Sequence, residues 1–217
     1  MMKFLCPLIS FLLMFHLSHA QQALTSGKIE MKVTKVENAG LKGSMINGST
    51  QTVYFNSSFD RLSIYTMKGM VKMDIVNDKT TDKTLMLTGG MMLGKKKIKV
   101  ESQEKEPREY TITYDESDTK TILGYNCKKA VLENDKLKME VYFTEQIDVT
   151  QTPLRQQFSG LRGFPLQYTI IDDEGVRITY TAQDIDTNIS LADFDLPTDG
   201  YEEMTEAEAK KMLRNAG

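Results

Sequence analysis

The stretch of residues 119–147 constrains the fold more than any other part of the 217-residue chain. After the dipeptide Asn134-Asp135, apolar residues alternate with polar ones, and the apolar set is Leu137, Met139, Val141 and Phe143. A period of two places the two sets on opposite faces of a β-strand. Asn and Asp also tolerate the positive backbone angles of a two-residue hairpin loop. The stretch therefore predicts two strands joined by a tight turn at Asn134-Asp135.

The same alternation recurs along most of the chain and predicts about nine or ten antiparallel strands, each with one apolar and one polar face. A sheet with that many strands tends to curl, and its concave apolar face then needs cover. Two predicted helices provide it: one starts at Pro153, and the other follows a capping box of Thr205 and Glu208. The expected fold class is mainly β (α+β), a curved antiparallel sheet that forms a half-barrel with two short helices over its concave face.

Polar and glycine-rich stretches mark the expected turns of this sheet. Residues 38–49, which contain three glycines, are predicted to be a loop, and residues 115–118 are predicted to be a turn between two strands. No linker or internal repeat divides the sequence, so a single domain over residues 21–217 is expected.

Residues 1–20 have the pattern of an export signal. Lys3 precedes an apolar run over residues 4–15, and Ser18-His19-Ala20 is a small-x-small cleavage site. The run is too short to span a bilayer, although a transmembrane anchor is the alternative interpretation. Cleavage near Ala20 predicts a periplasmic or secreted protein that is not an integral membrane protein.

Removal of the signal would change the chemical inventory of the chain. Both histidines and Cys6 lie within it, which leaves no His, no Trp and only Cys127 in the mature chain. This composition excludes His-based metal sites, Ser/His or Cys/His nucleophile pairs and an internal disulfide. The mild acidity with mixed signs gives no footprint for nucleic acid. We therefore expect no cofactor, no metal and no nucleic-acid partner.

Cys127 itself has three interpretations. It is a reactive thiol, a partner for another chain, or a small buried apolar residue. No CxxC pair is present, which excludes a dithiol oxidoreductase.

Three short motifs together carry a family resemblance. They are ILGYNCKK at residues 122–129, GFPL at residues 163–166, and the ending Phe194-x-Leu196-Pro197-x-x-Gly200-Tyr201. The sequence resembles an uncharacterised exported bacterial domain family of unknown function, which is similar to the periplasmic lipoprotein carriers of the LolA/LolB type. The resemblance implies a LolA-like half-barrel whose apolar cavity accepts acyl chains, and it brings no catalytic residues.

The sequence thus favours a non-enzymatic envelope protein that binds a lipid, another apolar ligand or the acyl chain of a lipoprotein partner. The alternative is a structural or protein-interaction module with a packed core and no ligand, and a hydrolase that uses carboxylates alone is a third. If a cavity exists, its expected ligand-binding wall is Met139, Phe143, Ile178 and Tyr180, and its expected lid is Leu154, Phe158 and Leu161. The alternation predicts an apolar face but leaves open whether that face is hollow or packed.

Overall fold

The computed structural model describes residues 23–91, 94–101, 109–135, 137–149, 152–205 and 208. Its strands are β1 (Gly27–Glu37), β2 (Thr50–Phe55), β3 (Phe59–Thr66), β4 (Val71–Asp78), β5 (Lys83–Gly89), β6 (Lys96–Glu101), β7 (Thr111–Ile122), β8 (Tyr125–Asn134), β9 (Leu137–Thr144), β10 (Phe164–Ile171), β11 (Arg177–Asp186) and β12 (Glu202–Glu203). The helices are α1 (Gly40–Ile46) and α2 (Pro153–Gln157), and the 3₁₀ turns are η1 (Met67–Gly69) and η2 (Leu191–Phe194).

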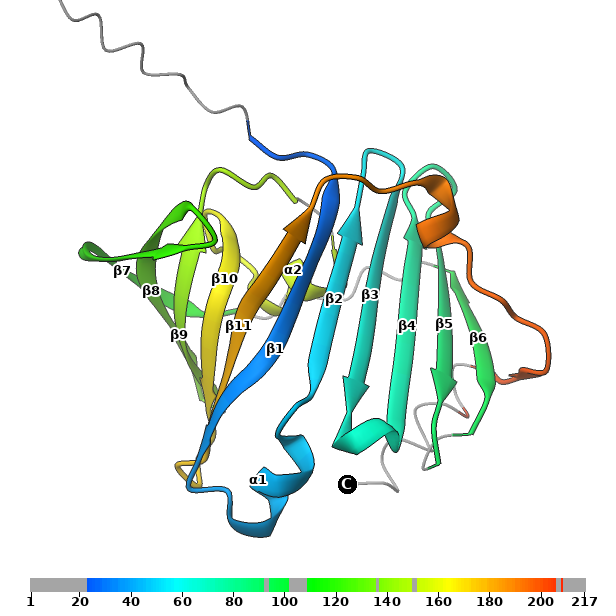
Figure 1. Ribbon diagram of the computed structural model, residues 1–217, viewed down its shortest axis with the longest axis horizontal. Helices are drawn as coiled ribbons and strands as arrows, with labels where there is room; N and C mark the ends of the chain where they lie inside the picture. Colours follow the sequence, from blue (N-terminus) through cyan, green and yellow to red (C-terminus); the bar gives the residue numbers. More distant parts are fainter. Residues whose placement is uncertain are drawn as a thin grey trace, which may run out of the picture.

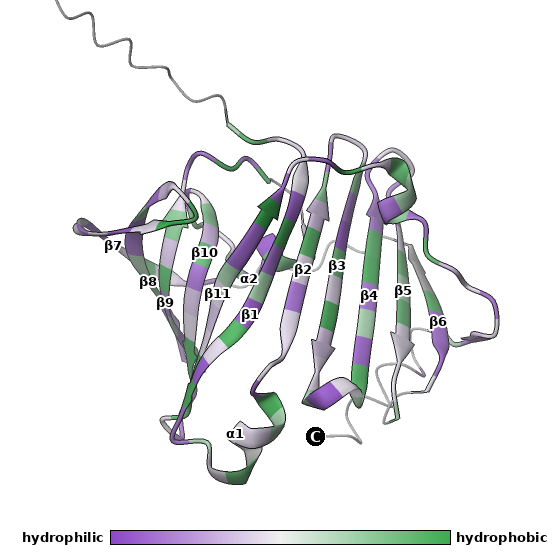
Figure 2. Cartoon of the chain, in the orientation of Figure 1, coloured by the Kyte–Doolittle hydropathy of each residue, from purple (hydrophilic) through white to green (hydrophobic). Residues whose placement is uncertain are grey.

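All twelve strands form one open sheet in the order β12-β6-β5-β4-β3-β2-β1-β11-β10-β9-β8-β7. Every neighbouring pair is antiparallel except β12 and β6. Figure 1 shows that the sheet curves, with α2 behind it in this view. Bands of apolar and polar residues alternate along β1, β3 and β4 (Figure 2). The predicted fold class, a mainly β protein built on a curved antiparallel sheet, is confirmed.

The main core lies between the sheet and the segment that contains α2. It takes inward-facing side chains from β1, β2, β8, β9 and β10, and α2 with the loop after it adds Leu154, Phe158 and Leu161. At its centre the ring of Phe158 meets the ring of Tyr168 edge-on, with centroids 4.9 Å apart. The hydroxyl of the fully buried Tyr168 donates to Oε1 of Gln51 at 2.6 Å, which satisfies its polar end.

The helix predicted at Pro153 is present as α2, although it is only five residues long. Thr152 caps it by accepting a hydrogen bond from the backbone N–H of Arg155 at 2.9 Å. For the second predicted helix, the structure shows the capping box, in which Thr205 N–H donates to a carboxylate oxygen of Glu208 at 2.8 Å. The remainder of that helix prediction lies outside the described residues, as does the predicted export signal.

The loop predicted over residues 38–49 was wrong, because it contains α1. The glycine content suggested a loop, but Gly43 serves close packing instead. A Cβ at this position would lie 3.1 Å from Cβ of Ala39 and 3.2 Å from Cγ1 of Val36. Backbone bonds from Gly43 N–H to Ala39 and from Asn47 N–H to Gly43 then complete the helical turns.

The hairpin predicted at Asn134-Asp135 is confirmed, since Asn134 pairs with Leu137 across the turn between β8 and β9. A second hairpin precedes it, because Leu123 and Gly124 have positive φ angles of 49° and 84° and join β7 to β8. The turn predicted over residues 115–118 is instead a bulge inside β7. Asp115 and Thr119 pair with the consecutive residues 129 and 128, so three residues of β7 have no opposite partner.

The C-terminal segment covers part of the outer face of the sheet. After β11 it crosses to η2 and then runs down the far edge to β12 (Figure 1). Its Leu196 and Tyr201 pack on Val76, Leu85 and Leu87 of β4 and β5 as a second, smaller core. No helix within the described ranges is long and apolar enough to cross a membrane.

We predict that Phe158→Ala destabilises the protein by about 3–5 kcal/mol, because it leaves a cavity in the centre of the main core. Leu41→Ala on α1 is the control, since Leu41 is 89% exposed and its change should stay within about 0.5 kcal/mol. Urea unfolding gives both free energies. Equal costs for the two variants would contradict the packing described here.

A second prediction concerns Asp60, which is fully buried in β3. Lys79 Nζ lies 3.0 Å from its Oδ1, yet neither carboxylate oxygen accepts a well-directed hydrogen bond within the described residues. Burial raises the pKa of Asp60, and Lys79 opposes that shift. A raised folded-state pKa gives stability that is present below the ordinary carboxyl pKa and lost as pH rises through the folded value.

Asp60→Asn keeps the shape of the protonated form and cannot ionise. We therefore expect the free energy of unfolding of the variant, relative to the parent, to increase as pH rises from about 3 to about 7. Urea unfolding at several pH values measures this difference. A difference that is constant with pH would show that Asp60 titrates alike in the folded and unfolded chains.

Candidate functional site

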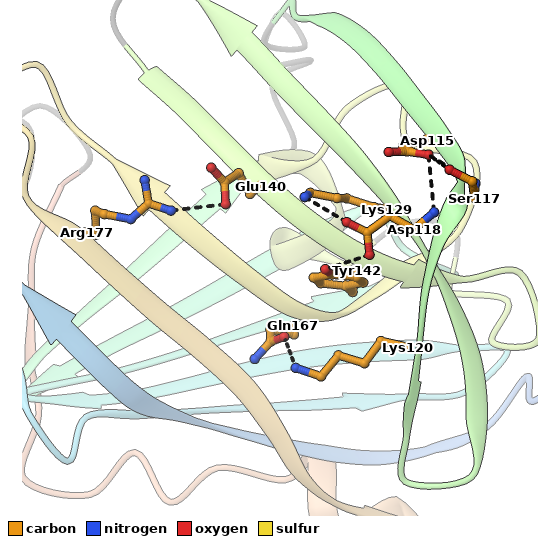
Figure 3. Close-up of polar contacts among 9 residues, drawn as sticks. All are labelled: Asp115, Ser117, Asp118, Lys120, Lys129, Glu140, Tyr142, Gln167 and Arg177. Atoms are coloured by element: carbon orange, nitrogen blue, oxygen red, sulfur yellow. Dashed lines mark hydrogen bonds and ion pairs between the residues drawn. The ribbon is translucent and has the colours of Figure 1, made fainter.

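A strip of interacting polar side chains crosses the outer face of the sheet from β7 to β11. We call it the polar strip and define it by Asp118, Lys120, Lys129, Glu140, Tyr142, Gln167 and Arg177, all drawn in Figure 3. The C-terminal segment packs on β4 and β5. These two strands lie on one side of β1 in the sheet, and the strands of the strip lie on the other. Among the described residues, the strip therefore lies on a part of the outer face that the C-terminal segment does not cover.

The alternation within the strands positions most of the strip. Because Met139, Val141 and Phe143 point into the core with no exposed surface, Glu140 and Tyr142 point outward between them. The bulge in β7 adds Asp118, whose backbone N–H donates to Oδ1 of Asp115 at 3.2 Å. A regular strand would place this carboxylate differently, so the bulge aims it at the neighbouring strands.

Tyr142 is the centre of the strip. Its hydroxyl donates to Oδ1 of Asp118 at 3.0 Å, and Lys129 Nζ donates to Oδ2 of the same carboxylate at 2.9 Å. The ammonium groups of Lys120 and Lys129 lie 5.5 and 5.9 Å from the centroid of the Tyr142 ring. Two cations therefore lie beside the ring of Tyr142, and one anion accepts a hydrogen bond from its hydroxyl.

The same contacts set the protonation states. The hydrogen bond from Lys129, followed by that from Tyr142, lowers the pKa of Asp118. Partial burial raises the pKa of Tyr142, and the neighbouring Asp118 adds to this rise. At neutral pH Asp118 is thus an acceptor and Tyr142 a neutral phenol that donates to it.

Toward β11 the strip ends in an ion-pair cluster. Arg177 Nη2 donates to Oε2 of Glu140 at 3.0 Å, and its Nε lies 3.7 Å from Oε2 of Glu37 on β1. The guanidinium group thereby connects β9, β11 and β1.

A second chain of hydrogen bonds runs parallel to this cluster. Lys120 Nζ donates to Oε1 of Gln167 at 2.7 Å, although β8 and β9 separate their two strands in the sheet. The side-chain amide of Gln167 then donates to Oγ1 of Thr181 at 2.8 Å, and this hydroxyl shares a 3.0 Å hydrogen bond with Thr34 of β1. The strip carries three cations, Lys120, Lys129 and Arg177, and two carboxylates, Asp118 and Glu140. The adjoining Glu37 of β1 supplies the third carboxylate, so positive and negative charges balance over this region, which presents a fixed array of donors and acceptors around one aromatic ring.

The residues predicted from the sequence to line a cavity lie on the opposite side of the sheet. Six of the seven belong to the main core: Met139, Phe143, Leu154, Phe158 and Leu161 are buried in it, and Tyr180 packs against it. Tyr180 stacks on Tyr168 with ring centroids 5.0 Å apart. The seventh, Ile178, is half-buried opposite Val36 and Ile170. The structure thus packs most of this set together, and a ligand-binding role for these residues stays a prediction.

Cys127 is fully buried next to the same core. Burial raises its pKa to about 11, so the thiol is protonated at neutral pH and is a poor nucleophile. Of the three interpretations, this geometry matches the small buried residue.

No residue of the polar strip was predicted from the sequence to belong to a site. The outward set of β9 was visible in the alternation, but the meeting of Lys120 with Gln167 depends on the bulge and on the strand order. Within the described residues, no group of three or more His, Cys, Asp or Glu side chains is placed to hold a metal ion.

The protein is thus a β-sheet domain, in which one open, curved antiparallel sheet has a packed concave side and a polar strip on its outer face. The family model described as "N-glycanase peptide, N-terminal domain" matches residues 64–185, more than half of the chain. The chain belongs to this family.

Solved structures agree with the family at the level of the fold. Two structures of PNGF-II, in space groups P21 and C2, both align with a TM-score of 0.52 at 15% and 16% identity. Each alignment covers 88% of this chain but only 34% and 33% of the PNGF-II chains, so this chain spans about a third of their length. No curated protein matches the sequence.

These matches overturn the resemblance to the LolA/LolB-like carriers, and with it the expectation of a LolA-like, lipid-binding domain. The motifs behind that resemblance are short, and part of what they encode is turn geometry. Gly124, for example, has a φ of 84° in the β7–β8 hairpin, a requirement that many antiparallel sheets share.

Proposed function

We propose that this chain is an exported, non-enzymatic module that binds the glycan of a glycoprotein through the polar strip. The strip is the observation that carries the proposal. The family description, which names an N-glycanase peptide, supports a glycan as the ligand class.

The strip has the chemistry that a glycan requires. Sugar hydroxyl groups both donate and accept hydrogen bonds, and a site whose charges balance offers partners to them without attracting ions. Asp118 and Glu140 supply acceptors, and Lys129 and Arg177 supply donors. The Tyr142 ring lies at the centre with two ammonium groups beside it. All of them project from strands, which hold their positions more firmly than loops do.

A binding role fits this set of side chains better than catalysis. The carboxylates of Asp118 and Glu140 are each engaged with a cation, at 2.9 and 3.0 Å, and the lowered pKa of Asp118 makes it a poor general acid. Cleavage of the export signal would also remove both histidines of the sequence.

To test glycan binding, we would titrate the protein with an N-glycosylated peptide and with the same peptide after glycan removal. The parent should bind only the glycosylated form. Tyr142→Ala removes the central ring and the phenol, and we expect about tenfold weaker binding. Lys138→Ala is the matched control, because Lys138 lies on the same face of β9 outside the strip, with Nζ 4.0 Å from its neighbour Glu133.

Equal binding by the parent and Tyr142→Ala would show that the strip is not the binding surface. Equal binding of the peptide with and without its glycan would show that the glycan is not the ligand.

Export has its own test. The Lys3, apolar run and Ser18-His19-Ala20 pattern predicts that the exported protein begins at Gln21. N-terminal sequencing of protein recovered outside the cytoplasm measures this directly, and an intact Met1 terminus would contradict it.

One observation favours a second function, a protein-interaction module. Leu41 and Met45 of α1 are 89% and 38% exposed, and because they are four residues apart on one helix they share a face, which gives an apolar patch for docking. Under this function the peptide without its glycan would bind as well as the glycosylated one, and Leu41→Asn would weaken binding while Tyr142→Ala would not.

A further inference from the structure

A hollow of about 520 Å³ lies where α1 turns back against the end of β1. Thr34 of β1 forms part of one wall, and Asn38, Ser44 and Asn47 form the others. The volume is within the range of about 300–1,000 Å³ that small-molecule sites occupy. None of the residues of the polar strip lines it, so it is a separate place on the surface.

The hollow nevertheless continues the strip. The hydroxyl of Thr34 closes the hydrogen-bond chain that starts at Lys120 and passes through Gln167 and Thr181, with the last contact at 3.0 Å. β9, which carries Tyr142, is three strand spacings from β1, about 14 Å. An extended ligand centred on Tyr142 therefore reaches the hollow along a continuous row of polar groups.

The local backbone builds the walls of the hollow. Asn38, and Gly40 at the first position of α1, adopt positive φ angles of 58° and 51°, which turn the chain from β1 into α1. Nδ2 of Asn38 is anchored to the carbonyl oxygen of Gly175 in the β10–β11 turn at 3.0 Å. Gly43 then lets α1 approach Val36 closely enough to close the far side.

The lining selects the chemistry of the occupant. Its polar side chains are hydroxyls and amides, and its one charged residue, Lys35, is engaged with Glu37 at 3.0 Å. The side chain of Asn47 lines the hollow and is exposed, so its amide is available to a ligand. Neutral donors and acceptors of this kind suit hydroxyl and amide groups and offer nothing specific to an anion.

We propose that the hollow is a second subsite that holds an uncharged sugar unit of the glycan whose other units lie on the polar strip. This inference rests on the proposed glycan-binding function and adds to it a position, a length requirement and a charge preference. A glycan too short to extend from Tyr142 to Thr34 uses only the strip, and a longer neutral glycan uses both places.

The test compares glycopeptides that carry three glycans: a neutral N-glycan, the same glycan trimmed to its core disaccharide, and the same glycan ending in sialic acid. Ser44→Trp fills the hollow from the exposed face of α1. Leu41→Trp is the matched control, because it adds the same ring to the same helix at a residue that does not line the hollow. Asn47→Ala removes the available amide without filling the space.

The parent should bind the neutral long glycan about tenfold more tightly than the trimmed one and the sialylated one. Ser44→Trp should remove this advantage and leave binding of the trimmed glycan unchanged, Asn47→Ala should reduce it in part, and Leu41→Trp should behave as the parent. Thermal melting confirms that each variant is folded.

Two results overturn the inference in distinguishable ways. If the parent binds glycans and Ser44→Trp binds the long neutral glycan equally well, the subsite is wrong and the strip stands. If the parent binds none of the three glycans, the proposed function is wrong and the subsite fails with it.

Discussion

The structure depends on how an unclosed curved sheet buries its concave side. A barrel closes on itself, but this sheet is open, so another segment has to cover its inner apolar face. The segment of α2 does so with Leu154, Phe158 and Leu161, and the edge-on contact of Phe158 with Tyr168 lies at the centre. These side chains are almost fully buried, so they form a packed core on the concave side, and the proposed recognition uses the other face of the sheet.

The outer face of the sheet has two halves that differ in what lies on them. On one half, Leu196 and Tyr201 of the C-terminal segment cover β4 and β5. On the other half, the edge strand β7 carries a bulge with acidic residues, a feature that discourages pairing with another chain. The same bulge presents Asp118 to Tyr142, so protection of the edge and construction of the polar strip have one structural cause.

Much of the fold could be predicted from the sequence, because the alternation of Leu137, Met139, Val141 and Phe143 fixes which side of β9 is inside. The start of α2 at Pro153 was also visible in the chain, although its cap at Thr152 was not predicted. The helix α1 was missed because Gly43 has a packing role that its sequence context does not reveal. The site was missed because its contacts join residues far apart in sequence: Gln167 lies 47 positions from Lys120, and Thr34 lies 147 from Thr181.

The resemblance to lipoprotein carriers was wrong because the pattern behind it, an alternating apolar face, has more than one use. An apolar face of alternating residues is required both by a carrier with a cavity and by a sheet packed on its own helix segment, so the pattern cannot separate them. What separates the two cases is how much of the concave side the side chains of the covering segment fill. Here large residues such as Phe158 and Leu161 fill it. The outer strip differs in kind, because an array of paired charges and amides around an aromatic ring is not needed to fold a sheet. Several strands contribute to this array and it leads to a hollow, which is why we propose recognition there.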